Sequence, residues 1–413
     1  MNETIKQRIA TIRNDEVPAG YKNSKVGIVP AEWEIVPLGE YLLQYNEVSQ
    51  YSDQYPVLTS SRKGIFLQSD YYNKDIASED NTGYNIVPYG YFTYRHMSDD
   101  EVFKFNINNL VPKGIVSTLY PVFTTTDVIE KGFLRELLNN GREFKRHAIL
   151  QKQGGSRTYM YFAKLQKLII ALPPLAEQQK IAKILTTCDR VIELKEKRIA
   201  GKQRQKKYLM QQLLTGKKRL KGFHGEWEVL RAREIFKNIT DKKHNGDLEV
   251  LSATQDRGII PRKDVDINIK YDKDSLSSYK KVKRGNYVIS LRSFQGGIEY
   301  SEYEGIVSPA YTVLTPCKDI ADGYYKQFFK SPDYISQLSI AVYGIRDGKQ
   351  IGYDDFGRMR IPYPTVTEQI AIANVLAVAD HEISLLQRDL EQEKQKKKAL
   401  MQLLLTGIVR VSA

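Results

Sequence analysis

The sequence predicts an α+β protein in which one unit, a mixed α/β domain followed by a long helix, occurs twice in tandem. A segment that opens with PPLAEQ at 173–178 and closes with LMQQLLTG at 209–216 returns as PTVTEQ at 364–369 and LMQLLLTG at 400–407, at a constant separation of 191 residues (407 − 216). The only two tryptophans lie in matching EWE triplets, at 32–34 and 226–228, each shortly before a long stretch rich in Tyr, Val, Ile and Gly. Such a duplicated chain can fold with a pseudo-two-fold axis, like a dimer whose subunits are covalently joined.

The repeat divides the chain into five predicted segments. By symmetry, the short tail after the second helix should dock against the first domain, because the first helix leads directly into the second domain. The segments are a first domain at 1–172, a first helix at 173–216, a second domain at 217–363, a second helix at 364–407 and a docking tail at 408–413.

Both globular stretches contain short apolar runs bounded by turn residues, which indicates mainly β structure with a few helices. Two further pairs of segments match between them: 57–65 resembles 250–259, and 114–120 resembles 305–311. Between these pairs the two stretches diverge. The pattern predicts a shared scaffold with different surface segments.

The two long segments have the start and stop signals of helices: a proline before the start, a glutamate in the first turn and a glycine after the last leucine. Roughly 40 residues in a helix would span about 60 Å. Their apolar residues alternate at steps of four and three, which is typical of a coiled-coil seam, and polar seam residues such as Lys206 and Lys397 would help to set register and orientation. We predict an antiparallel coiled coil of the two helices with the seam residues Ile181, Leu185, Ile192, Ile199, Leu209, Leu213, Ile372, Leu376, Ile383, Leu390, Leu400 and Leu404.

The chain carries 62 Lys and Arg against 49 Asp and Glu, a net charge of +13. This excess favours a polyanionic partner, nucleic acid first and an anionic membrane second. No run approaches the roughly 18 apolar residues of a membrane span, and the start of the chain lacks the apolar core of a signal peptide, so we expect a soluble, cytoplasmic protein.

No motif indicates catalysis, a bound cofactor or a metal site, since the glycine-lysine pairs lack P-loop spacing and the five histidines lack ligand spacing. Arg, Lys and Gln in glycine-rich loops suit contacts with base edges and phosphates, although each alone also fits a solvated surface. Acid pairs such as Asp99-Asp100 are interpreted as ordinary exposed turn residues. The predicted DNA-binding residues are Arg62, Lys63, Arg95, Lys152, Gln153, Arg157, Arg257, Arg292, Gln295, Arg346, Lys349 and Gln350.

Together, the GYK and GIVPAEW segments at 20–34, the PPLAEQ and TEQ helix starts and the LMQQLLTG ending resemble the DNA-specificity subunit of type I restriction-modification enzymes. The resemblance covers essentially the full length. It implies a non-catalytic subunit whose two variable domains, called target recognition domains, each read one half of a split DNA sequence. The two helices would form a spacer that sets the gap between the halves, roughly one helical turn of DNA or about 34 Å.

The resemblance also implies the partners: double-stranded DNA, two modification subunits and two restriction subunits, with no membrane. The modification subunits would be adenine-N6 methyltransferases that use S-adenosylmethionine, and the restriction subunits would be ATP-dependent translocating nucleases. No cofactor is expected in this chain, because S-adenosylmethionine, ATP and Mg belong to the partners. The second helix lacks the double proline of the first, so the equivalence of the two methyltransferase contacts stays open.

Two alternative functions, from other classes of protein, also fit the sequence. One is a coiled-coil scaffold with two protein-binding heads that never touch DNA, which a binding assay on duplex DNA would distinguish. The other is an enzyme, such as a nuclease active on its own, which hydrolysis by the purified chain would reveal.

Overall fold

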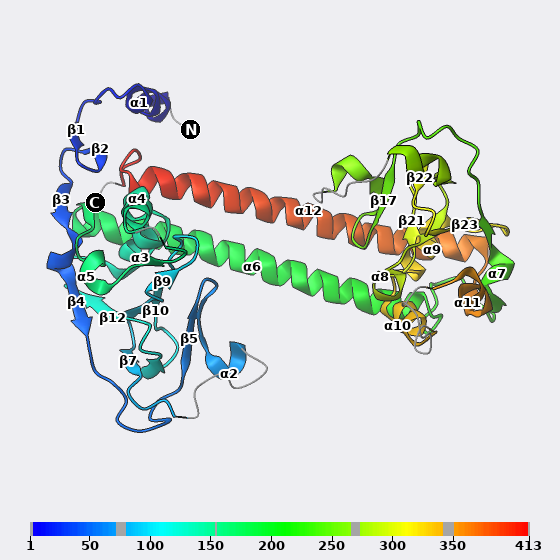
Figure 1. Cartoon of the computed structure of the whole chain (residues 1–413), viewed down its shortest axis with the longest axis horizontal. Coiled ribbons are helices and arrows are strands. Elements are labelled where there is room, and N and C mark those ends of the chain that lie inside the picture. The colour runs from blue at the N-terminus through cyan, green and yellow to red at the C-terminus, as the bar shows by residue number, and fades with distance from the viewer. Residues whose placement is uncertain (1–2, 72–79, 153–154, 266–272, 342–350, 412–413) are drawn as a thin grey trace. The chain divides into compact units, whose positions relative to one another are not determined.

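The computed structural model describes residues 3–71, 80–152, 155–265, 273–341 and 351–411 (Figure 1). Internal contacts divide the chain into two compact units. Unit 1 comprises Met1–Leu194 and Leu390–Ala413, and unit 2 comprises Lys195–Asp389. Each unit therefore contains one globular domain and about half of each long helix. The five-segment division predicted from the sequence, which assigns the whole helices to a spacer, stays a prediction.

Two helices are far longer than the rest: α6 (Leu175–Leu213) and α12 (Val366–Leu405). The remaining elements of unit 1 are α1 (Glu3–Arg13), β1 (Tyr21–Ser24), β2 (Gly27–Pro30), β3 (Glu34–Pro37), β4 (Leu42–Tyr45), β5 (Leu58–Ser61), β6 (Gly64–Leu67), α2 (Gln68–Tyr71), β7 (Asn85–Pro88), β8 (Phe92–Thr93), β9 (Met97–Ser98), β10 (Asn106–Ile107), β11 (Lys113–Val116), β12 (Val122–Thr125), α3 (Lys131–Asn140), α4 (Arg142–Leu150), β13 (Thr158–Tyr159), α5 (Phe162–Leu165) and β14 (Ile169–Leu172).

Unit 2 has the same alternation of short strands and helices. Its remaining elements are β15 (Glu228–Arg231), α7 (Ala232–Ile235), β16 (Phe236–Ile239), β17 (Leu251–Thr254), β18 (Gly258–Pro261), β19 (Lys280–Val282), β20 (Tyr287–Ile289), α8 (Ser293–Gly296), β21 (Glu299–Tyr300), β22 (Gly305–Val307), β23 (Thr312–Pro316), α9 (Asp322–Phe328), α10 (Pro332–Ala341), α11 (Tyr353–Arg358) and β24 (Arg360–Tyr363).

The two globular domains share one sheet topology. A four-stranded antiparallel sheet has the order β10-β8-β12-β4 in unit 1 and β21-β20-β23-β16 in unit 2. Around it lie matching antiparallel pairs: β5-β6 and β17-β18, β7-β11 and β19-β22, β3-β14 and β15-β24. In the described part of the chain, the pair β9-β13 occurs in unit 1 alone. The predicted α+β class is confirmed, and the duplication extends to the strand order.

The matching sequence segments of the two domains lie in matching elements, and a glycine shows why. Gly114 in β11 and Gly305 in β22 each lie against the hairpin that precedes them. A Cβ atom at Gly114 would lie 2.4 Å from Leu58 Cδ1, and one at Gly305 would lie 2.4 Å from the Glu249 carbonyl oxygen. At Gly305 the nearest atom is backbone, so a side chain there would push the preceding segment away from the strand, whereas at Gly114 the nearest atoms belong to the Leu58 side chain.

Each unit buries its own core, and each core includes helix ends from both long helices. In unit 1, Ile181 and Leu185 of α6 and Leu404 of α12 join the aromatic core of the domain. In unit 2, Leu213 of α6 and Leu376 of α12 do the same. By length and composition alone, one 18-residue window of α12 is apolar enough to cross a membrane, and 17% of that window is buried in the structure.

Within unit 2, ion pairs between the two long helices show that they run in opposite directions. Lys195, Lys202 and Lys206 of α6 contact Asp389, Glu382 and Asp380 of α12, at 2.9, 2.8 and 2.6 Å respectively. In unit 1, Lys397 of α12 lies 2.6 Å from Asp189 of α6. The polar residues that interrupt the apolar seam are thus paired across it.

The predicted seam residues themselves are mostly buried. The coiled-coil packing in the strict sense stays a prediction. The buried residues are Ile181, Leu185, Ile199, Leu213, Ile372, Leu376, Ile383 and Leu404, and the half-buried ones are Ile192, Leu209, Leu390 and Leu400.

The repeated Glu-Trp and Glu-Gln tags meet in both units at the base of a long helix. In unit 1, Glu177 at the start of α6 accepts hydrogen bonds from Trp33 Nε1 at 3.0 Å and from the guanidinium of Arg410, with Nε 2.8 Å away. Arg410 follows the end of α12, so the tail of the chain lies against the first domain. Tyr21 also donates a hydrogen bond to the Gly407 carbonyl, at 2.7 Å.

Unit 2 repeats this arrangement with different chain segments. Glu368 at the start of α12 accepts from Trp227 Nε1 at 2.9 Å and from Arg219 Nε at 2.6 Å, and Arg219 follows the end of α6. The two glutamates are 3% and 1% exposed. The segment after each long helix is therefore held to the start of the other long helix by one buried carboxylate.

The glutamine of each Glu-Gln tag is also buried and fully used. The Gln178 side chain accepts from the Glu130 amide at 2.9 Å and donates to the Pro173 carbonyl at 2.9 Å. Gln369 makes the corresponding bonds to Ala321 and Pro364. These bonds join the first turn of each long helix to the domain before it.

Candidate nucleic-acid interface

Each globular domain presents a short hairpin with an arginine at its tip. In unit 1 the hairpin is β5-β6 and the tip is Arg62 and Lys63; Ser61 Oγ accepts from the Lys63 amide at 3.1 Å. In unit 2 the hairpin is β17-β18; Thr254 Oγ1 accepts from the Arg257 amide at 3.2 Å. A hydroxyl that bonds the backbone two or three residues ahead favours such tight turns, which project the arginine into solvent.

In unit 1, three cations predicted to bind DNA are paired with three consecutive acids. Arg62 makes a bidentate contact with Asp100, with NH1 2.8 Å from Oδ2. Arg157 Nε lies 2.9 Å from Asp99 Oδ1, and Lys152 Nζ lies 2.5 Å from Glu101 Oε1. The guanidinium of Arg62, followed by the Ser98 hydroxyl, lowers the pKa of Asp100 to about 2. The Asp100 carboxylate is therefore ionised at neutral pH. At this position three cations are paired with three acids.

Backbone register explains why these residues meet. Strand β9 pairs with β13 so that Ser98 lies opposite Thr158, and continuing this register places Asp99 opposite Arg157. Asp100 is oriented by its own segment, since Ser98 Oγ donates to Asp100 Oδ1 at 2.8 Å. Glu101 adopts a left-handed backbone conformation with φ of 57°, which turns the chain back toward β10.

A small cavity of about 230 Å³ lies at this position in unit 1. Its walls include Arg62 from the hairpin, Arg95 after β8 and Asp99 after β9. Two aromatic rings nearby, His96 and Tyr161, stack with centroids 5.1 Å apart. The structure thus brings Arg62 and Arg95 to one cavity and joins Lys152 and Arg157 to the same acidic segment, whereas Lys63 is exposed beside them at the hairpin tip.

A buried amide fixes the hairpin of unit 1. Asn106 in β10 is 6% exposed, and its Nδ2 donates to Ser60 Oγ at 2.8 Å and to the Ser61 carbonyl at 2.9 Å. Because both acceptors precede Arg62 directly, the position of the tip is set by the central sheet. This pre-organises the arginine for contact with a ligand.

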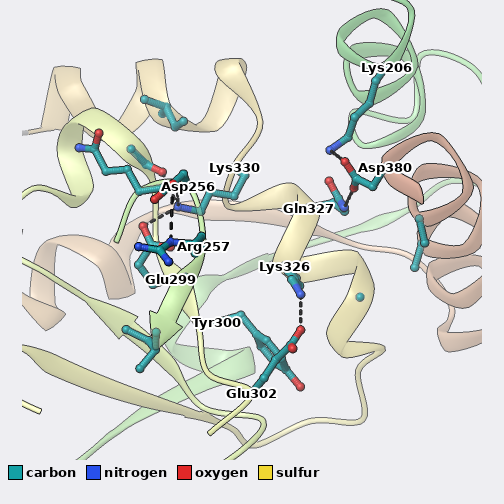
Figure 2. A pocket seen from close by; sticks show the side chains of 18 of the residues that line it. Lys206, Asp256, Arg257, Glu299, Tyr300, Glu302, Lys326, Gln327, Lys330 and Asp380 are labelled. Carbon is teal, nitrogen blue, oxygen red and sulfur yellow. Dashed lines mark hydrogen bonds and ion pairs between the residues drawn. The ribbon is translucent and has the colours of Figure 1, made fainter. Parts of the chain in front are cut away.

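In unit 2, a larger cavity of about 1030 Å³ lies between the hairpin tip, strand β21, helix α9 and the long helices (Figure 2). Charged side chains line it in pairs: Lys206 with Asp380, Lys326 with Glu302, and Lys330 with Glu299. Its charges nearly cancel, which suits a surface of hydrogen-bonding groups better than a site for a lone phosphate.

Lys330, which follows α9, holds the hairpin tip of unit 2, as Asn106 does in unit 1. Its Nζ donates to Glu299 Oε1 at 2.5 Å, to the Gly296 carbonyl at 2.8 Å and to the Gln255 carbonyl at the hairpin tip at 3.2 Å. Glu299 is 2% exposed, and in the described part of the chain its Oε2 has no hydrogen-bond partner. Burial raises the pKa of Glu299 to about 7, because the loss of solvation outweighs the attraction of Lys330.

The raised pKa of Glu299 predicts how stability changes with pH. The native state binds a proton more tightly than the unfolded chain, so the stability of unit 2 should fall as pH rises from the ordinary value of 4.5 to about 7. Glu299→Gln should flatten this dependence. Urea unfolding at about pH 5 and about pH 8 checks it, with the sign fixed by the linkage relation. An equal loss of stability with pH in wild type and variant would contradict the assignment.

Of the predicted DNA-binding residues in unit 2, the structure describes three. Arg257 lines the cavity, and Arg292 and Gln295 are exposed at α8. Gln153, Arg346, Lys349 and Gln350 lie outside the described residues. The predicted DNA-binding roles themselves stay predictions.

Sequence reasoning missed the residues that hold and neutralise the arginines. Asn106 and Lys330 were not singled out, and Asp99 and Asp100 were interpreted as ordinary exposed turn acids. One signal was present in the sequence: the three acids are consecutive at 99–101, at the end of a segment already selected for Arg95. Long-range pairing with residues 62, 152 and 157 cannot be derived without the strand register.

Known proteins resemble this chain in one domain and along nearly its full length. Residues 103–201 match the type I restriction modification DNA specificity domain. In Methanocaldococcus jannaschii, the protein named as the specificity subunit of type I restriction enzyme MjaX is 26% identical over 422 residues, covering 95% of this chain and 97% of its own. The type I restriction enzyme MjaVIII specificity subunit of the same organism is 26% identical over 426 residues, covering 93% of this chain and 94% of its own.

Solved structures show the same fold. A chain from a structure of the assembly and conformational transition of a type I R-M system matches with a TM-score of 0.58 and 18% identity, over 92% of this chain and 99% of its own. The type I restriction-modification S subunit from M. genitalium matches with a TM-score of 0.51 and 12% identity, over 90% of this chain and 96% of its own. In one domain and along nearly its full length, this chain is therefore similar to type I restriction-modification DNA-specificity subunits.

Proposed function

We propose that this chain is the sequence-specific DNA-binding subunit of a type I restriction-modification complex and recognises a split DNA target. One observation carries this proposal: the same scaffold, with a hairpin that presents an arginine, occurs once in each unit. Two such domains read two half-sites, and arginine can bond guanine acceptors in the major groove. The net charge of +13 supports a polyanionic partner.

The chain acts through partner subunits and has no catalytic role of its own. Adenine-N6 methylation by S-adenosylmethionine-dependent modification subunits and ATP-dependent cleavage by restriction subunits, two of each, would follow from where this chain places them on DNA. S-adenosylmethionine, ATP and Mg would all be bound by those partners. The complex would work on DNA in the cytoplasm.

The test is methylation in a host that lacks adenine methylation. The chain is co-expressed with the modification subunit encoded beside it, and the host DNA is sequenced for modified adenines. We expect one split motif, methylated on both strands. The contradicting outcome is a complex that assembles but leaves the DNA unmodified and does not bind duplex DNA, which would favour a protein scaffold.

A matched control links the result to the candidate interface. Arg62→Ala with Arg95→Ala should abolish or relax the half of the motif read by unit 1 and leave the other half intact, because the two cavities belong to separate units. Loss of both halves at once would indicate a general defect of assembly.

A further inference from the structure

The acidic segment of unit 1 lies where DNA phosphates would be expected. Its three acids contact three of the five predicted DNA-binding cations of unit 1 one to one: Asp99 with Arg157, Asp100 with Arg62 and Glu101 with Lys152. These cations come from three places in the sequence, the hairpin tip, the end of α4 and the start of β13. A single segment of three residues therefore neutralises all of them.

The geometry makes the acids independent of the cations that they contact. Asp100 is positioned by the buried Ser98 hydroxyl, and Asp99 by the register of β9 with β13. Glu101 is 26% exposed on its side chain, the least of the three acids. If the cations moved to another anion, the backbone of the acidic segment would stay in place, because the pairing of β9 with β13 and the bond from Ser98 to Asp100 do not involve them.

The ion pairs are also easily exchanged. The side chains of Arg62 and Arg157 are 60% and 51% exposed, and those of Asp100 and Asp99 are 50% and 71% exposed. Exposed pairs of this kind typically contribute less than about 1 kcal/mol each. Phosphates of a duplex can therefore compete with the acids for the cations. Each new contact between a cation and a phosphate first requires that the ion pair with the acid be broken.

Unit 2 differs at the equivalent position. Arg257 lies beside Asp256, its sequence neighbour, at 3.8 Å, and donates to the Asp264 carbonyl at 3.1 Å. In the described part of unit 2, no acidic run contacts Arg257, Arg292 or Gln295. The neutralising segment is thus a feature of the first domain.

We propose that residues 99–101 are an intramolecular competitor for DNA phosphate, which suppresses non-specific binding by unit 1. On random DNA, phosphate contacts alone replace the three ion pairs, so little binding free energy is gained. On the correct half-site, base contacts add to them and the cations transfer to DNA. Breaking the three ion pairs costs the same free energy in both complexes, so the acids weaken binding to random and target DNA alike, but only the target complex has base contacts that outweigh this cost. This inference rests on the proposed DNA-binding function.

The test uses the full chain in complex with its modification subunit and two probes: a random-sequence duplex and the duplex identified by methylation mapping. The variant is Asp99→Asn with Asp100→Asn and Glu101→Gln. The charge-matched control is Glu3→Gln with Asp15→Asn and Glu16→Gln, three exposed acids in α1 and just after it that contact none of the predicted cations. Both triple substitutions remove three negative charges, so any difference in DNA affinity between the two variants results from where the acids lie and not from the net charge.

We expect the variant to bind the random duplex about tenfold more tightly than the control does, with a gain of about the same size on the target duplex, because the same ion pairs are broken in both complexes. Three released cations would steepen the plot of log affinity against log salt on random DNA by up to about 2.7, at about 0.9 per phosphate contact. Adding Arg62→Gln to the variant should remove part of the gain. Variant and control that bind random DNA equally, or a variant that binds it more weakly, would show that the acids only position the arginines and would overturn the proposal.

The proposed function and this inference fail in different ways. A wild-type complex that binds neither duplex contradicts both. A wild-type complex that prefers its target, with a variant that matches the control, contradicts the inference alone.

Discussion

Glu368→Ala should destabilise unit 2 by about 3 kcal/mol or more, because a buried carboxylate that pairs with a cation leaves that cation and its other donors unsatisfied when removed. Glu368 is 1% exposed and accepts from both Arg219 and Trp227. Arg219 keeps partial access to water, with 23% of its side chain exposed, so it can recover some solvation. The loss should still exceed that of any exposed ion pair in the same unit.

Tryptophan fluorescence in a urea titration measures this effect directly. The chain has two tryptophans, one beside each of the paired glutamates, so a Trp33→Phe background leaves Trp227 as the reporter of unit 2. Glu302→Gln is the matched control, because Glu302 pairs with Lys326 at a side chain that is 59% exposed and should cost less than about 0.5 kcal/mol.

A double-mutant cycle with Arg219→Ala separates the pair from the rest of the site. Removing both partners should cost less than the sum of the single losses, since neither charge is then left alone. If Glu368→Ala unfolds within about 1 kcal/mol of wild type, the desolvation of the pair already offsets its attraction, and the role of the pair would be to set the geometry of the segment after α6.

The sequence was sufficient to predict the duplication and the two long helices, because both follow from local patterns, whereas the coiled-coil seam stays a prediction. Helix starts at the Glu-Gln tags, helix ends at the glycines and apolar steps of three and four need no knowledge of distant residues. The role of the tags was only half predicted. Glu177 was expected to favour the helix start by its charge, whereas in the structure it also contacts Trp33 and Arg410, which are 144 and 233 positions away.

The candidate interface was predicted less completely, because its residues meet through strand register. Arg62 and Arg95 could be selected from composition and glycine context, but their neutralisation by residues 99–101 depends on which strands pair. Lys330 and Asn106 have related roles with different chemistry, so comparing the two halves of the sequence could not reveal them. Divergent surface segments on a shared scaffold limit such inference in general.

Gly297→Ala should have the other large effect, both on stability and on the unit 2 interface. Gly297 ends α8 with φ of 81° and ψ of −171°, a conformation that is essentially confined to glycine. A Cβ atom there would lie 2.0 Å from the Phe329 carbonyl oxygen, which belongs to the backbone of a fully buried core residue. Strain and overpacking together should cost about 3 kcal/mol or more.

The consequence for function follows from the next residue. Phe329 directly precedes Lys330, whose ammonium group contacts the carbonyl of Gln255 at the hairpin tip. Displacing Phe329 should therefore move Lys330 and loosen the hairpin that presents Arg257. In the methylation assay, we expect the half of the motif read by unit 2 to be lost or relaxed while the other half persists, provided the chain folds at the temperature used.

Gly285→Ala is the control that separates backbone strain from the contact with Phe329. Gly285 has a similar φ of 91°, but the nearest atom to its added Cβ would be Asp322 Oδ2 at 3.8 Å, an ordinary contact distance. It should cost only about 1–2 kcal/mol, the penalty of the left-handed region for a residue with a side chain. If the two variants lose equal stability, the close approach to Phe329 relaxes freely and the link from Gly297 to the hairpin is wrong. A larger loss for Gly297→Ala, with altered recognition of one half-site alone, would show that a single backbone contact joins the core of unit 2 to its candidate interface.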